Sequence, residues 1–295
     1  HFGRAADACF VSQPTLSVAI KKLEEELNVS LFERGSSEVS LTPVGERVVV
    51  QAQRVLEEAS AIKAIAQQGK DPLAGPLRVG VIYTIGPYLL PGLVSSMIEK
   101  VPTMPLVLQE NFTVRLLELL KQGEIDVAVL ALPINESGFV IQPLYDEPFI
   151  VALPKSHRWA QETTIRSDDL RGENMLLLGA GHCFRDQVLG VCPELSRFSQ
   201  SSEGIQRTFE GSSLETIRHM VASGLGISIL PLSAVDSHHY APGVIEVRPL
   251  SPPVPFRTVA IAWRASFPRP KAIEILADSI RLCSVAKPAA PVTAG

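Results

Sequence analysis

Residues 175–192 read MLLLGAGHCFRDQVLGVC and encode a strand, a tight loop and a helix in succession. The short apolar run at the start predicts a buried strand, and the two glycines after it predict the loop. Phe184, Val188 and Val191 then recur at helical spacing. We therefore expect Cys183 in the first turn of a helix, where free N–H groups favour a thiolate over a thiol.

Cys183 has two possible cationic neighbours and a second cysteine downstream. His182 precedes Cys183, Arg185 lies two residues after Cys183, and Cys192 lies nine residues after it. A continuous helix would separate the two cysteine Cα atoms by roughly 13 Å, whereas a disulfide needs them within about 7 Å. Either the pair never bonds, or bonding unwinds the segment and acts as an oxidation switch. By spacing alone, inert thiols are the commoner case, and no second Cys/His pair nearby favours a metal site.

Length and composition restrict the class of protein. The chain has 295 residues, a formal net charge of -4 and four cysteines. It is long enough for two or three domains, and it has no apolar run of the roughly 18 residues that a transmembrane helix needs. The scattered cysteines fit a reducing compartment, where a disulfide would be transient. The charge gives no global argument for nucleic-acid binding, so that function must rest on a local motif.

Residues 2–34 predict a helix-turn-helix. A short Ala-rich helix precedes a tight connection and a second helix, which has Ser12 as N-cap and Pro14 in its first turn. Small polar residues at the start of this helix suit a recognition helix in the major groove, and residues 31–41 suit a wing hairpin. An ordinary helical hairpin is the alternative. The expected DNA-contacting residues are Ser12, Gln13, Pro14, Thr15, Ser17, Lys21, Lys22 and Arg34.

A long helix follows, beginning at Thr42-Pro43 with the threonine as its cap. Apolar residues recur along it at alternating four and three residues, namely Val48, Ala52, Val55, Ala59, Ile62 and Ala66. One narrow apolar seam favours a partner helix, so we interpret the segment as a linker and dimerisation helix. Packing against its own domain is the alternative.

From Leu77 onward, strands alternate with helices, which predicts a mostly parallel sheet with helices on both faces. The predicted fold class is α/β: a winged helix-turn-helix, a long linker helix, and a two-lobed regulatory domain like that of periplasmic binding proteins. A cleft between such lobes is a usual place for a small ligand. The predicted divisions are the DNA-binding domain 1–41, linker helix 42–70, hinge 71–76, lobe I (77–146 and 255–285), lobe II (147–254, with Cys183 and Cys192) and a disordered tail 286–295.

Together these features resemble a LysR-type transcriptional regulator, from His1 to about Ser284. Three motifs are similar to those of the peroxide-sensing members of that family: residues 181–187 with the later Cys192, residues 83–91, and residues 213–218. The resemblance implies that Cys183 is oxidised by hydrogen peroxide to a sulfenic acid, which Cys192 then captures as a disulfide. It further implies that Thr84 and Thr113 hold the peroxide, within a polar shell of His182, Arg185, Asp186 and Arg257.

The resemblance also implies the partners and the compartment. We expect a cytoplasmic regulator of antioxidant genes that binds double-stranded promoter DNA as a homotetramer, a dimer of dimers formed through the linker helix and the lobes. RNA polymerase is an expected partner, and we expect no cofactor, no metal and no membrane. Simpler structural roles remain open: Thr84 and Ser213 as N-caps, Asp186 in a helix ion pair, and His182 at the surface.

Two departures from the family pattern and three alternatives accompany this hypothesis. The first helix of the DNA-binding domain is expected upstream of His1, and residues 193–208 are longer than the pattern. Cys9 and Cys283 are interpreted as structural. The main alternative is a LysR-type regulator gated by a small-molecule effector in the lobe cleft. A thiol peroxidase or oxidoreductase is disfavoured by the helix-turn-helix, and a periplasmic solute-binding protein would not need residues 2–34.

Overall fold

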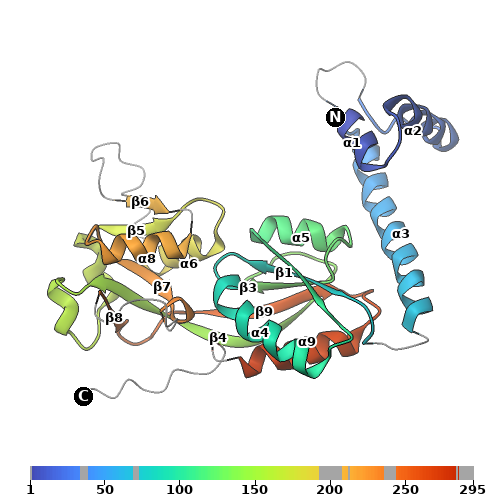
Figure 1. Cartoon of the computed structure of the whole chain (residues 1–295). Helices are drawn as coiled ribbons and strands as arrows, with labels where there is room; N and C mark the ends of the chain where they lie inside the picture. The colour runs from blue at the N-terminus through green and yellow to red at the C-terminus, as the bar shows by residue number, and fades with distance from the viewer. Residues whose placement is uncertain are drawn as a thin grey trace. The chain divides into compact units, whose positions relative to one another are not determined.

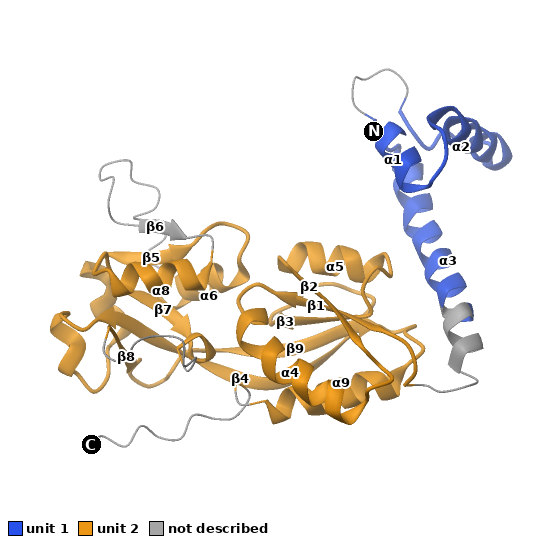
Figure 2. Cartoon of the chain, viewed as in Figure 1, with its two compact units in different colours: residues 1–63 blue, residues 64–295 orange. Residues whose placement is uncertain are grey.

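The computed structural model describes residues 2–33, 39–68, 73–192, 208–211, 213–235, 244–283 and 285. Arg34, most of the longer segment after Cys192 and the predicted tail therefore lie outside the described residues. The chain divides into two compact units, residues 1–63 and 64–295 (Figure 2). Within the described ranges, no helix combines the length and apolar character that crossing a membrane requires.

The first unit contains α1 (Phe2–Ala8), α2 (Gln13–Leu27) and most of α3 (Pro43–Gln68). Ser12 caps α2 as predicted, because its side chain accepts a hydrogen bond from the Thr15 N–H. Between α2 and α3, Phe32 and Leu41 form an antiparallel bridge at the base of the expected wing. The only buried hydrophobic residues described in this unit are Ala6 and Leu31. Among the apolar residues of α2, Leu23 is 42% exposed and Leu27 is 44% exposed in the single chain.

The long helix α3 begins where the sequence predicts. The Thr42 hydroxyl accepts the Gly45 N–H at 2.9 Å and donates to the Ser30 carbonyl at 2.7 Å, so it both caps α3 and ties it to the preceding loop. Its apolar seam lies open along the part whose side chains are described. Val55 is 59% exposed and Ile62 is 68% exposed.

Lobe I is built on the strand order β2-β1-β3-β9. These strands are β1 (Leu77–Ile82), β2 (Leu106–Asn111), β3 (Val127–Ala131) and β9 (Phe256–Arg264). Strand β1 runs parallel to β2 and β3, whereas β9 runs antiparallel to β3. Helices α4 (Gly86–Lys100) and α9 (Pro270–Leu282) cover one face, and α5 (Thr113–Lys121) covers the other (Figure 1).

One long strand, β4 (Phe139–Pro154), joins the two lobes. It pairs antiparallel with β9 as far as Pro148, and then with β7 (Ser228–Pro231) and β8 (Ile245–Pro249). Strand β4 thus begins in lobe I and ends in lobe II, and the mostly parallel sheet that we predicted is in fact mixed. The reason is that the chain leaves lobe I along β4 and returns along β9, so these neighbours run in opposite directions.

Lobe II completes the fold with β5 (Met175–Leu178), α6 (Cys183–Val191), β6 (Thr208–Gly211) and α8 (Leu214–Ala222). Strand β5 pairs parallel with β6. Three short 3-10 turns, Arg158–Gln161, Ser167–Gly172 and Leu232–Ala234, connect the strands. Each lobe has its own hydrophobic core, and the second core includes Phe149, Phe184 and Val188. The expected two-lobed α/β architecture is therefore present.

Candidate functional site

The cysteine turn forms as predicted, with β5 leading through a short loop into α6. Gly181 has a φ of +95°, a left-handed conformation that a side chain would strain. His182 is the N-cap residue, with extended backbone and no side-chain capping bond, and Cys183 is the first residue of the helix. The half-buried Cys183 thus lies among the free N–H groups of the α6 N-terminus.

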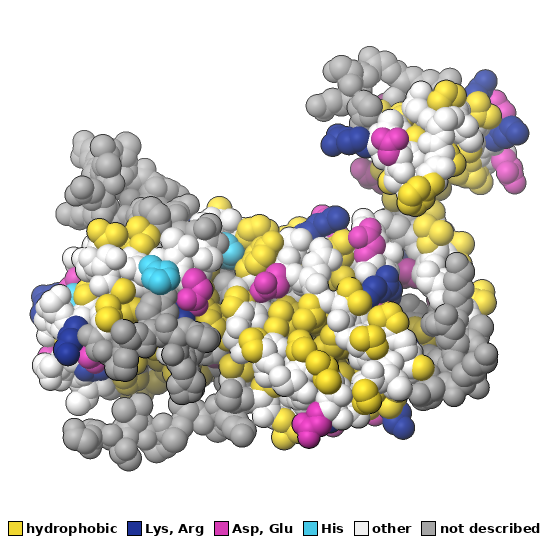
Figure 3. Space-filling view, in the orientation of Figure 1, with side chains coloured by type: hydrophobic (Ala, Val, Ile, Leu, Met, Phe, Trp, Pro, Cys, Tyr) yellow, Lys and Arg dark blue, Asp and Glu magenta, His cyan; other side chains and the backbone are white. Residues whose placement is uncertain are grey.

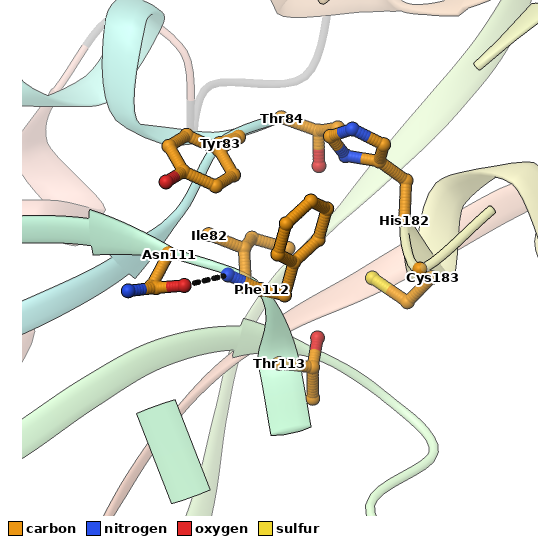
Figure 4. Close-up of a pocket in the computed structure, with 9 residues that line it drawn as sticks. Ile82, Tyr83, Thr84, Asn111, Phe112, Thr113, His182 and Cys183 are labelled. Atoms are coloured by element: carbon orange, nitrogen blue, oxygen red, sulfur yellow. Dashed lines mark hydrogen bonds between the residues drawn. The ribbon is translucent and has the colours of Figure 1, made fainter. Parts of the chain in front are cut away.

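A small pocket opens beside Cys183, with an empty volume of about 170 Å³ including open solvent. Three turns line it: residues 82–84 at the end of β1, residues 111–113 from the end of β2 to the start of α5, and residues 181–183. The first two turns follow the carboxyl ends of adjacent parallel strands, where α/β folds commonly bind ligands. Of the predicted shell, Thr84, Thr113, His182 and Cys183 come together here (Figure 4).

Two threonine hydroxyls in the pocket differ in their partners. Thr84 Oγ1 accepts a hydrogen bond from Arg257 Nη1 at 2.8 Å. Thr113 Oγ1 is buried and has no hydrogen-bond partner among the described residues. Figure 4 shows this hydroxyl and the Cys183 sulfur turned toward the same space. A buried hydroxyl without a partner is costly, so Thr113 is suited to bind a small polar ligand beside the sulfur.

Arg257 lies at the junction of the lobes and reaches the pocket only through Thr84. Its Nε donates to Glu147 Oε2 at 2.7 Å, and its Nη2 donates to the Thr84 carbonyl at 2.9 Å. Both charged side chains are almost fully buried, and the Ser233 N–H donates to the other Glu147 oxygen at 2.9 Å. The guanidinium also lies 5.3 Å from the ring centroid of Phe184 in α6. Arg257 therefore links Thr84, lobe II and α6.

The structure does not bring the other predicted charges to the pocket. Arg185 Nη1 donates to the Leu178 carbonyl at 2.8 Å and lines a second small pocket, of about 190 Å³, between α6 and the lobe II strands. Asp186 is exposed and forms no ion pair with the described residues. The simpler reading of Asp186 as a helix ion pair is therefore wrong, as is that of His182 as a surface residue, because His182 is buried. Ser213 does cap α8.

The second cysteine belongs to a different environment. Cys192 is the C-cap residue of α6 and is buried in the lobe II core, whereas Cys183 packs against the lobe I core. None of the four cysteines forms a disulfide in this structure. Of the two that we interpreted as structural, Cys283 is buried, as that role requires, whereas Cys9 is exposed. Nine helical residues place the Cys183 and Cys192 Cα atoms roughly 13 Å apart. A disulfide between them requires α6 to unwind.

Several contacts at the site had no clear sequence signal. Ile82, Tyr83, Asn111, Phe112 and Gly181 also line the pocket. Tyr83 and Gly181 lie in two of the motifs given above, and the position of Asn111 and Phe112 at the carboxyl end of β2, next to β1, could have indicated them.

Two hydrogen bonds also join the lobes near α6. Tyr88 of α4 donates to Glu215 of α8 at 2.8 Å, and Gln187 Nε2 donates to the Leu132 carbonyl at 3.0 Å. Glu215 Oε1 also accepts from Arg218 at 2.8 Å. Rearrangement of α6 would therefore break contacts with lobe I.

The predicted DNA-contacting residues, apart from Arg34, occupy the cap and the first ten residues of α2. Ser12, Gln13, Pro14 and Thr15 are exposed, as are Lys21 and Lys22. The Ser12 hydroxyl is 2.7 Å from the Thr15 hydroxyl, and Gln13 Nε2 donates to Ser17 Oγ at 3.1 Å. Figure 3 shows basic and acidic side chains together on the surface of this unit. Any DNA contact therefore depends on a local face of α2. No described residues cluster as a group of three or more metal-ligand side chains.

Comparison with known proteins gives two family matches that together span most of the chain. Residues 1–46 match the bacterial regulatory helix-turn-helix protein family of the lysR type, and residues 70–282 match the LysR substrate binding domain. The chain is 42% identical over 281 residues to a hydrogen peroxide-inducible genes activator of Dickeya chrysanthemi, covering 95% of this chain and 90% of that protein.

A relative from Escherichia coli and a solved structure agree with these family matches. The DNA-binding transcriptional dual regulator OxyR of Escherichia coli is 41% identical, with the same coverage. A full-length OxyR variant from Pseudomonas aeruginosa is 60% identical, covers 99% of this chain and 93% of its own, and superposes with a TM-score of 0.79. These homologues are transcriptional regulators, and neither matched family is an enzyme family.

Proposed function

Because the chain belongs to the LysR family of transcriptional regulators, we propose that it is an OxyR-type activator of antioxidant genes that senses hydrogen peroxide through Cys183. The observation that carries the proposal is the shared pocket of Cys183 and Thr113. A half-buried sulfur at a helix N-terminus opens onto the same small space as a buried hydroxyl with no partner among the described residues. This arrangement suits a peroxide, which needs a thiolate to react with and hydroxyl groups to orient its oxygens.

The proposed chemistry has two steps. The Cys183 thiolate attacks one peroxide oxygen, the O–O bond breaks, and the departing hydroxide takes a proton to become water. The Cys192 thiolate then attacks the sulfur of the resulting sulfenic acid, the S–S bond forms as the S–O bond breaks, and the departing hydroxide takes a proton to become a second water. In total, one hydrogen peroxide and two thiols become one disulfide and two water molecules. No cofactor or metal is required.

The surrounding residues have different roles in this chemistry. We assign Thr84 and Thr113 to the peroxide itself, and Arg257 to the positioning of Thr84 through its two hydrogen bonds. His182 closes the pocket as the residue before Cys183. Arg185 holds the Leu178 carbonyl at the end of β5, and Asp186 adds charge at the surface of α6.

The signal follows from the separation of the two thiols. Because Cys192 is buried in the lobe II core, forming the disulfide must unwind α6 and withdraw Cys192 and Val188 from that core. Gln187 of α6 is bonded to Leu132 of lobe I, so the rearrangement also alters the junction of the lobes. We propose that this change rotates one lobe against the other and repositions the DNA-binding units.

The assembly proposed is a cytoplasmic homotetramer, a dimer of dimers on double-stranded promoter DNA that engages RNA polymerase. The exposed apolar seam of α3 supports pairing with a second α3 helix, since such seams are stable when buried against a partner. The exposed cap and first turns of α2 support insertion in the major groove.

The test uses the full chain with stoichiometric hydrogen peroxide. Alkylation and mass spectrometry should show the loss of two thiols, at Cys183 and Cys192, together with a changed promoter footprint. Cys183→Ser should lose both responses. Cys9→Ser, at an exposed cysteine of the first unit, is the matched control and should keep them. A peroxide-dependent footprint in Cys183→Ser would refute the proposal.

The effector-gated alternative is less well supported by the size of the pocket. Sites for small organic ligands are commonly about 300–1,000 Å³, whereas the pocket beside Cys183 has about 170 Å³ including open solvent.

A further inference from the structure

Three aromatic rings from three different turns meet at the pocket beside Cys183. Phe112 lies 4.8 Å from His182 and 5.2 Å from Tyr83, measured between ring centroids, and Tyr83 lies 6.1 Å from His182. All three pairs are edge-to-face, the favourable geometry for aromatic rings in contact. We call Tyr83, Phe112 and His182 the aromatic rim, and Figure 4 shows them grouped on one side of the pocket.

The rim is held in place from several directions. The Phe112 N–H is bonded to the Asn111 side-chain oxygen at 3.0 Å, and the Phe112 carbonyl accepts the Leu116 N–H at 3.0 Å as α5 begins. A side-chain carbon added at Gly181 would lie 3.5 Å from the Phe112 ring, so the cysteine loop packs close to that ring. The His182 ring is buried. The rim is thus a fixed wall.

Two members of the aromatic rim, Tyr83 and Phe112, also face solvent. Tyr83 is 40% exposed and Phe112 is 38% exposed, although both line the pocket. Thr113 and Thr84, by contrast, present buried hydroxyls. An oxidant that approaches Cys183 past the aromatic rim therefore meets large apolar rings at the outside and polar groups within.

We propose that Tyr83 and Phe112 set the oxidant specificity of Cys183, admitting hydrogen peroxide and excluding hydroperoxides that carry a bulky carbon substituent. This inference rests on the proposed function and specifies which peroxides the site accepts. Hydrogen peroxide is close to water in size and needs only the polar part of the pocket. An alkyl hydroperoxide must place its carbon skeleton where the rings already touch.

The experiment compares two oxidants on the full chain. The rate constant for loss of the Cys183 thiol is measured with hydrogen peroxide and with cumene hydroperoxide, by rapid quenching and alkylation. In Phe112→Ala and in Tyr83→Ala, the ratio of the hydrogen peroxide rate to the cumene hydroperoxide rate should fall by about tenfold or more, the scale at which a pocket wall discriminates against added carbon. Val114→Ala is the control, because Val114 is 71% exposed on α5 and does not line the pocket.

Using the ratio removes effects common to both oxidants, such as a loss of folded protein. An unchanged ratio in both rim variants, with hydrogen peroxide still oxidising Cys183, overturns this inference and leaves the proposed function intact. Equal slowing with both oxidants also overturns it, because that result identifies a structural role. If wild-type Cys183 reacts with neither oxidant, the proposed function fails, and this inference fails with it.

Discussion

Replacing Arg257 with methionine tests how strongly the junction of the lobes depends on one buried ion pair. The change removes the three hydrogen bonds from Arg257 to Glu147 and Thr84 while keeping a flexible side chain of moderate size. Glu147, whose side chain is 2% exposed, would keep only the Ser233 N–H as a donor among the described residues.

The expected cost follows from that burial. Removing one partner of a buried ion pair costs about 3–5 kcal/mol, because the remaining charge has lost both water and its counter-ion. Glu147→Met should cost a similar amount. The double variant Arg257→Met/Glu147→Met should cost less than the sum of the single variants by about 2 kcal/mol or more, since it leaves no uncompensated charge.

Urea unfolding followed by tryptophan fluorescence suits this measurement. The chain has two tryptophans, Trp159 in lobe II and Trp263 in β9 of lobe I. Arg115→Met is the control, because its ion pair with Glu118 is about half exposed and should contribute at most about 1 kcal/mol. Additive single costs, or a loss below about 1 kcal/mol in Arg257→Met, would refute the assigned role of the pair. Slower oxidation of Cys183 should accompany the loss, because Thr84 is no longer held.

Three further predictions concern other parts of the chain. Burial first, and then a nearby carboxylate, raise the pKa values of Tyr88 and Tyr145, so the folded chain holds these phenolic protons more tightly than the unfolded chain. The stabilisation that results should be fully present below pH about 10 and should be lost as the pH rises above it. Urea midpoints across that range should fall less steeply in Tyr88→Phe/Tyr145→Phe, and an equal fall would count against the assignment. Gly181→Ala should cost about 1–2 kcal/mol because of its left-handed backbone, whereas Gly172→Ala, which meets no neighbouring atom, should cost less in the same unfolding assay. Ser12→Ala should destabilise the first unit by about 1 kcal/mol through loss of the α2 cap, seen as a lower melting temperature and weaker promoter binding; unchanged melting would contradict the cap.

Local signals in the sequence predicted the features that depend on neighbouring residues. Ser12, Thr42 and Ser213 cap the helices that follow them, because a short hydroxyl side chain reaches the free N–H groups of the next turn. The loop before Cys183 follows from the glycines after Leu178, because Gly181 takes a left-handed backbone conformation that glycine adopts readily. Family resemblance then drew attention to the threonines now found in one pocket.

Contacts between distant segments of the chain could not be predicted from the sequence. The first half of β4 carries prolines and charged residues, so its pairing with β9 could not be read from an apolar pattern. The partners of Arg257 lie 110 and 173 positions away in the chain. Arg185, by contrast, is two residues from Cys183, yet its guanidinium points to the Leu178 carbonyl and not into the pocket.

The amino-acid order alone indicated most of the helices and strands, where the helices begin, and that two cysteines lie nine positions apart at the ends of one helix. Those properties depend on backbone conformation and on side chains a few positions apart. Only the tertiary structure decided that the two thiols pack against different cores, and that aromatic rings from three turns enclose the site. It also decided that the Thr113 hydroxyl beside Cys183 has no hydrogen-bond partner among the described residues. Such features depend on which apolar surfaces bury one another, and that is settled only when the whole chain has packed.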